Sequence, residues 1–217
     1  MTIPFFQAEL EAIYGVRAPR VEEFLIDRAR AHANGNEPRA EEVLLVRESE
    51  DGLELGLFLA EEVLLAAVVT DPHDRRPRLT ARELLPLLAC AAEGVSHFVY
   101  LATRAAAGRP VSFLELEVQA EVDKWALLVL HLWRRGLRRF SPVLRRRLFQ
   151  RVRYRAQLGA EELERYRLAN RLAGGYARWL ERRYVAGCDA DGLVRELRAS
   201  YRLGGGEKLG YLESRAA

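Results

Sequence analysis

Two groups of polar residues in the 217-residue chain have the types and spacing that chemistry or ligand binding would need. The first group consists of two pairs, Glu93 with His97 and Glu117 with Glu121, and the members of each pair are four residues apart. Residues four apart lie on one face of a helix, so each pair would offer neighbouring oxygen or nitrogen ligands. Such ligands bind iron, manganese or zinc in helical bundles, and Lys124 or Tyr100 could assist proton transfer. The pattern permits a metal-dependent or acid–base enzyme.

Other features of the same residues argue against chemistry. A helix at the surface needs a polar face in any case, and Glu with His four residues apart is a common solvated pair. The ammonium of Lys124 would oppose a nearby cation, and the Glu-x-x-His repeat of di-iron bundle proteins is missing. The sequence therefore favours a protein that is not an enzyme and has no metal or cofactor, and the helical-bundle enzyme is the alternative.

The second group is basic. Between Asp123 and Glu161 the chain has no acidic residue and eleven basic ones. A GC-rich genome would raise the number of Arg residues, but it would not remove Glu and Asp. A surface of this kind attracts phosphate groups or acidic proteins. The candidate residues for binding an anion are Arg134, Arg135, Arg138, Arg139, Arg146, Arg147, Arg151, Arg153 and Arg155.

Charge is divided unevenly along the chain. Residues 1–132 carry a net charge of −9 and residues 133–217 a net charge of +12. These Arg residues could therefore pair with the acidic part of the same or a neighbouring subunit. No helix-turn-helix, zinc-finger or RNA-recognition signature accompanies the Arg residues. We expect a non-catalytic binding or adaptor protein with an anionic partner, nucleic acid first and an acidic protein surface second. The remaining alternative is a structural subunit of a homo- or hetero-oligomeric complex.

Helix start signals predict the elements that position these residues. Thr80 with Glu83 and Ser112 with Glu115 have capping-box spacing, which predicts helices over 80–107 and 112–135. Apolar and polar residues alternate at the start of the second segment as in a strand, but the cap and the long apolar continuation favour a helix. The short connection between the helices predicts antiparallel neighbours. Their polar stripes would then face either each other or solvent.

Further local signals extend the prediction along the chain. Ser141 and Pro142 have the types of an N-cap and a first-turn residue. The following helix would bury four apolar residues, Leu148, Phe149, Val152 and Ala156. Tyr154 could add stacking to an anion-binding surface. Two glycines inside the next helix, at 174–175, predict close helix packing or a bend.

The fold class is mainly α, a helical bundle of about seven to eight helices with one small N-terminal β-hairpin. The hairpin is expected over 42–59, and because two strands alone are marginal in water it must pack on helices or on another chain. A polar, Pro-containing stretch suggests a small α+β lobe over 1–78, followed by a helical core over 79–203. The glycine-rich segment 204–217 is expected to be a flexible tail.

Cysteine content and hydropathy bear on location. The two cysteines have no metal-site or disulfide spacing, which is typical of a reduced compartment. The N-terminus lacks a basic leader, and no uninterrupted apolar run reaches the ~18 residues of a spanning helix. We expect a cytoplasmic protein without membrane insertion.

Overall fold

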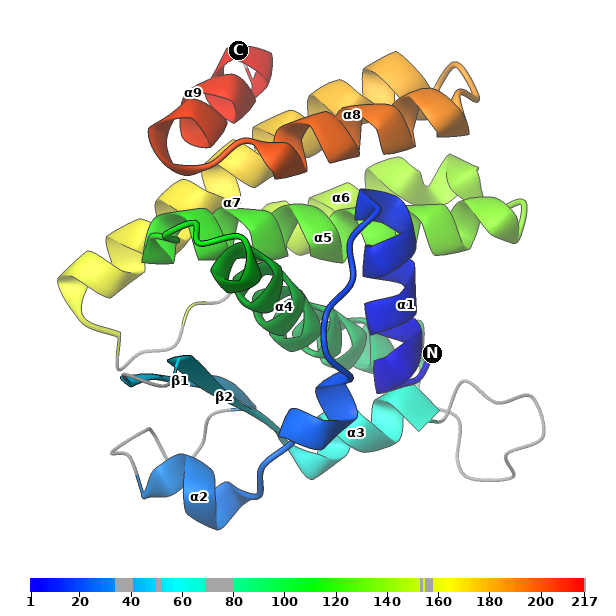
Figure 1. Ribbon diagram of the computed structural model, residues 1–217. Coiled ribbons are helices and arrows are strands. Elements are labelled where there is room, and N and C mark those ends of the chain that lie inside the picture. The colour runs from blue at the N-terminus through cyan, green and yellow to red at the C-terminus, as the bar shows by residue number, and fades with distance from the viewer. Residues whose placement is uncertain (34–40, 50–51, 69–79, 153, 155–157, 217) are drawn as a thin grey trace. The chain divides into compact units, whose positions relative to one another are not determined.

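The computed structural model describes residues 1–33, 41–49, 52–68, 80–152, 154 and 158–216 (Figure 1). They form two compact units. One comprises Met1–Ala12 and Val16–Arg109, and the other comprises Ile13–Gly15 and Pro110–Ala217. Over the described residues the chain has nine α-helices and one two-stranded antiparallel sheet near the N-terminus. The predicted mainly α fold with a small hairpin is confirmed.

The first unit holds the sheet and the helices around it. In chain order its elements are α1 (Ile3–Tyr14, whose last two residues belong to the second unit), η1 (Val21–Phe24), α2 (Arg28–His32), β1 (Glu42–Ser49), β2 (Gly52–Leu59), α3 (Glu61–Val68) and α4 (Ala81–Ala106). The strands pair in register from Glu42 opposite Leu59 to Ser49 opposite Gly52. Gly52, the first residue of β2, has a φ of +129°, a backbone conformation that a residue with a side chain rarely adopts.

The hairpin packs on α4, and Gly94 makes the close approach possible. A Cβ atom at this glycine would lie 2.8 Å from Cγ of Glu42 and 2.9 Å from Cδ2 of Leu59. The hairpin therefore buries its apolar face on a helix, as a two-stranded sheet must. The sequence predicted a helical core over 79–203, apart from a small lobe over 1–78, whereas α4 belongs to the same compact unit as the hairpin.

Helix α4 begins as the sequence predicted. The Thr80 side chain accepts a hydrogen bond from the Glu83 amide, and the Glu83 carboxylate accepts one from the Thr80 amide at 2.9 Å. Pro86 is accommodated inside the helix. By length and composition the segment Arg82–Ala106 could cross a membrane, but 56% of its most apolar window is buried within the protein, as in many core helices. The expected lack of membrane insertion stays a prediction.

The second unit contains helices and connecting segments but no strand among its described residues. Its elements after residue 110 are α5 (Phe113–Arg134), η2 (Arg138–Phe140), α6 (Ser141–Phe149), α7 (Ala160–Leu180), the π-helical turn η3 (Glu181–Val185), α8 (Ala190–Arg202) and α9 (Gly205–Ala216). Helix α7 packs along α5 on one side and against α9 on another (Figure 1). The helix predicted at Ser112 is confirmed, since Ser112 Oγ accepts from the Glu115 amide at 3.2 Å.

Glu115 departs from the predicted capping box. Its carboxylate accepts a hydrogen bond from the amide of Gly205 at 2.9 Å, at the start of α9, instead of returning to its own helix end. The prediction of a flexible tail over 204–217 is wrong, because Gly205–Ala216 form α9 and this helix docks on the helices before it. Leu212 is buried, and the buried Lys208 ammonium donates to the side-chain oxygen of Gln119.

A buried polar network lies where α9 and residues 13–15 meet α5. The phenol of Tyr14 donates to the carboxylate of Asp123, and Nε2 of Gln119 donates to the same carboxylate at 2.7 Å. The Tyr14 ring also stacks on Tyr201 of α8 with ring centroids 3.9 Å apart. Each side chain of this network thus has a hydrogen-bond partner, which offsets the cost of removing it from water.

Candidate anion-binding surface

The basic segment starts where α5 ends in a tight turn. Gly136 has a φ of +70° and donates its amide to the carbonyl of Trp133 at 2.9 Å, while the Leu137 amide donates to the carbonyl of Leu132 at 2.8 Å. This is the Schellman pattern, in which a glycine with positive φ stops the helix. The chain enters η2 and α6 directly, so that Arg residues before and after the turn lie close together in sequence and in space.

Helix α6 is anchored by its inner side. Leu144 and Ser141 are buried. Ser141 Oγ donates to one oxygen of Glu181, and Arg145 Nε donates to the other at 3.0 Å. The predicted N-cap role of Ser141 is therefore wrong: η2 runs directly into α6, Phe140 occupies the cap position, and the hydroxyl is used in a tertiary contact.

The outer side of this region presents most of the predicted Arg residues to solvent. We define the basic surface as the described members of the predicted set, Arg134, Arg135, Arg138, Arg139, Arg146, Arg147 and Arg151. Six are exposed and Arg138 is half-buried. Arg153 and Arg155 lie outside the described residues. Val152 was predicted to be buried, but it is exposed because α6 already ends at Phe149; Ala156 lies outside the described residues.

Ion pairing distinguishes the basic surface from the rest of the segment. Arg145, which is not part of it, is bound by Glu181 with both side chains largely buried. Arg135, Arg146, Arg147 and Arg151 form no ion pair with any residue in the described ranges. The guanidinium of Arg139 lies 5.1 Å from the ring centroid of Phe140, whose side chain is 43% exposed. Among the described residues, no carboxylate therefore pairs with these four Arg side chains.

Tyr154 has a different environment from the one predicted for a stacking residue. Its side chain is half-buried, and burial together with the negative charge of Glu121 raises the pKa of its phenol. Lys124 and Arg167 act in the opposite direction. The phenol therefore stays neutral and lies near the acid of α5. Its predicted contact with a ligand stays a prediction.

The four candidate metal ligands come from different units. Glu93 and His97 lie on α4, and His97 Nδ1 is 3.3 Å from Oε1 of Glu42 on β1. Glu117 and Glu121 lie on α5, where Lys124 Nζ donates to Oε1 of Glu121 at 2.9 Å. The four-ligand site stays a prediction that elemental analysis of the purified protein tests. The contact with Glu42 was missed because a strand residue 55 positions away has no helical spacing to reveal it.

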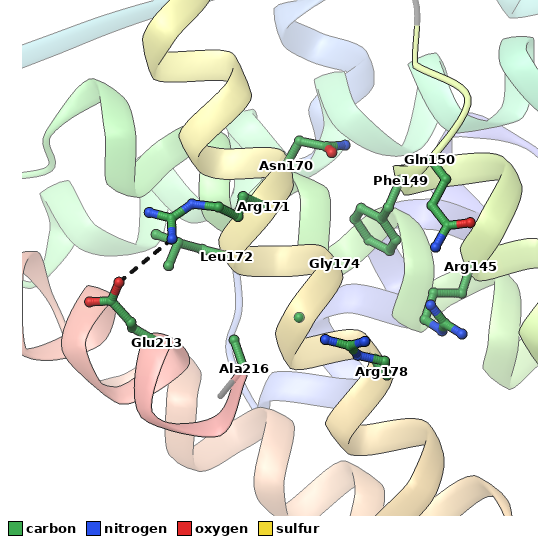
Figure 2. Close-up of a pocket in the computed structure, with 11 residues that line it drawn as sticks. Arg145, Phe149, Gln150, Asn170, Arg171, Leu172, Gly174, Arg178, Glu213 and Ala216 are labelled. Carbon is green, nitrogen blue, oxygen red and sulfur yellow. Dashed lines mark ion pairs between the residues drawn. The ribbon is translucent and has the colours of Figure 1, made fainter.

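Sequence reasoning also missed a polar hollow beside α6. It has a volume of about 440 Å³ and lies among α6, α7 and α9 (Figure 2). Its lining includes Arg145, Asn170, Arg171, Arg178 and Glu213. Two of these Arg residues are seven positions apart on α7, beside the predicted glycine pair, and this spacing on one helix face was the available signal.

Comparisons with protein-family models, curated proteins and solved structures found no match to the chain.

Proposed function

We propose that the protein is a non-catalytic nucleic-acid-binding module and that the basic surface contacts the phosphate backbone. The single observation that carries the proposal is the state of Arg135, Arg146, Arg147 and Arg151. All four are exposed, and none forms an ion pair with a described residue. Guanidinium groups in this state can bind phosphate oxygens without first losing an internal partner.

The charge of the surrounding sequence supports an anionic partner. Residues 110–217 contain 22 Lys and Arg residues and 13 Asp and Glu residues. No acid interrupts the stretch between Asp123 and Glu161, so a bound polyanion would meet no like charge along it. Long-range attraction of this kind raises the association rate and weakens with salt.

Phe140 favours a single-stranded nucleic acid over an acidic protein. Its ring is exposed within the basic surface, next to the guanidinium of Arg139. Proteins that bind single strands combine a positive surface with exposed aromatic rings on which bases stack. An acidic protein surface would use the guanidinium groups but would gain little from an isolated ring.

Charge reversal on α6 tests the proposal. We expect Arg146→Glu with Arg147→Glu to abolish binding to a fluorescein-labelled single-stranded oligonucleotide, measured by fluorescence anisotropy. Both side chains are exposed, so circular dichroism and the melting temperature should stay unchanged.

A matched control separates local contacts from net charge. Arg82→Glu with Arg195→Glu changes the charge equally at exposed positions outside the basic surface. This control should keep most of the affinity. Equal affinity of both double variants, or no binding by the wild-type protein at low salt, would refute the proposal. Binding to an acidic peptide but not to the oligonucleotide would assign the surface to a protein partner instead.

A further inference from the structure

The glycine pair of α7 allows residues of α6 and α9 to pack closely beside the hollow among these three helices. A Cβ atom at Gly174 would lie 3.1 Å from Cβ and Cγ of Phe149, and one at Gly175 would lie 2.4 Å from Cβ of Ala216. The absent side chains let Phe149 from α6 and Ala216 from α9 approach the same turn of α7. The predicted close packing at 174–175 is confirmed, and the hollow lies beside these close contacts.

Three guanidinium groups line the hollow, and they differ in how strongly they are already bound. Arg145 is held by Glu181. Arg171 is 3.8 Å from Glu213, and the two side chains are 67% and 64% exposed, so this pair is weak. Arg178 is exposed and forms no ion pair within the part of the chain that the structure describes. Arg178 is therefore ready to bind an anion, whereas the Arg171 guanidinium points toward Glu213 on α9 (Figure 2).

Asn170 provides a second, independent indication of a ligand. Its side chain is 9% exposed and lines the hollow. Its Nδ2 atom is buried and has no hydrogen-bond acceptor among the described residues. Leaving such a donor without an acceptor costs about 1–3 kcal/mol. A ligand oxygen in the hollow would remove this cost.

The arrangement of these groups fits a ligand with a charged end and a larger polar body. In Figure 2, Arg145, Phe149 and Gln150 approach from the side of α6, facing the α7 residues, while Glu213 and Ala216 approach from α9. The Gln150 amide supplies a donor and an acceptor beside the Phe149 ring. The volume of about 440 Å³ lies in the range of small-ligand sites and exceeds what a bare phosphate ion would fill.

We propose that this hollow is a binding site for a phosphate monoester of about the size of a mononucleotide. Arg178 binds the phosphate, and the Asn170 amide donates to a ligand oxygen. The phosphate monoester can come from a free nucleotide or from the 5′-phosphorylated end of a nucleic-acid strand. The site does not require the basic surface to bind nucleic acid, because none of the residues that carry it belongs to that surface.

Titration calorimetry with adenosine 5′-monophosphate and with adenosine tests the site. The wild-type protein should bind the monophosphate and not the nucleoside. Arg178→Gln should weaken binding of the monophosphate about tenfold or more, because it removes a charge-assisted hydrogen bond to the phosphate. Arg195→Gln, which removes an exposed charge on α8, should leave it unchanged. Equal binding of the two compounds, or equal effects of the two variants, would overturn the proposal.

Two oligonucleotides of one sequence, with a 5′-phosphate or a 5′-hydroxyl, identify the source of the phosphate. If the wild-type protein prefers the phosphorylated strand and Arg178→Gln loses this preference, the ligand is the phosphorylated end of a strand. Binding of the free monophosphate without such a preference supports a free nucleotide. Binding of neither overturns the site. The variant with Arg146→Glu and Arg147→Glu separates the two proposals, since it should keep affinity for the monophosphate while losing affinity for the 5′-hydroxyl strand.

Discussion

The salt dependence of binding should change by a defined amount when two Arg residues of α6 become neutral. A protein that neutralises Z phosphates of a single strand shows a slope of log K against log salt of about −0.7Z, because bound counterions are released. Four exposed side chains form no ion pair with a described residue, namely Arg135, Arg146, Arg147 and Arg151. If each neutralises one phosphate, Z is about 4 and the slope is about −2.8. Raising the salt from about 50 to about 200 mM should then weaken binding about fiftyfold.

Neutralising two of the four contacts should halve the slope of log K against log salt. For Arg146→Gln with Arg147→Gln we expect a slope of about −1.4 and a loss of about sevenfold over the same salt range. Fluorescence anisotropy titrations of one labelled single strand at four or five salt concentrations measure both slopes. Arg82→Gln with Arg195→Gln, at exposed positions outside the basic surface, should keep the wild-type slope.

The two slopes can contradict the assigned phosphate contacts even if the α6 variant binds the single strand more weakly. Equal slopes for the wild-type protein and the α6 variant would mean that Arg146 and Arg147 do not contact phosphate, whatever their effect on affinity. A wild-type slope near zero would mean that binding is not electrostatic. Equal reductions in both double variants would assign the effect to net charge instead of local contacts.

Three further outcomes are expected. Phe140→Ala should weaken binding of a single strand by about 1–3 kcal/mol and leave binding of a duplex nearly unchanged, as anisotropy would show; equal losses on both would exclude stacking. Gly175→Ala should lower the melting temperature, since its Cβ would overlap Ala216 and overpacking costs about 1–3 kcal/mol, whereas Gly210→Ala has open space around its Cβ and should not lower it. Burial and the nearby carboxylate of the network raise the pKa of Tyr14 well above 10.0, so its contribution to stability is present below pH 10 and is lost as the pH rises through the folded-state pKa. Chemical denaturation at several pH values should therefore show that Tyr14→Phe loses less stability above pH 10 than the wild-type protein does. The difference in the free energy of unfolding should grow by up to about 1.4 kcal/mol per pH unit. Identical pH profiles of the two proteins would contradict this assignment.

The sequence determined the features that depend on neighbours within one or two helical turns. The capping box at Thr80 and Glu83 and the cap at Ser112 could be predicted because each involves one side chain and an amide three residues away. Exposure of Arg146 and Arg147 was predicted from their helical spacing relative to apolar neighbours such as Leu148 and Phe149. The hairpin and the mainly α fold class followed from periodicity in the same way.

The tertiary structure decided which distant groups complete each local pattern. Ser141 has the type of an N-cap but binds Glu181, and the Glu115 carboxylate binds the amide of Gly205. The segment 204–217 has a flexible composition, yet Gly205–Ala216 form a helix that docks on α5 and α7, and Lys208 finds a buried acceptor 89 positions earlier in the chain.

The hollow shows the same limit at the level of a site. Glycines at 174–175 predicted that something packs closely on α7, but the sequence contained no sign that Phe149 and Ala216 are the partners. A cavity is defined by side chains from elements that are far apart in sequence, and its chemistry depends on which charges remain unpaired after folding. Local spacing carries neither kind of information, because Arg178 and Asn170 line a common hollow only where α7 packs beside α6 and α9.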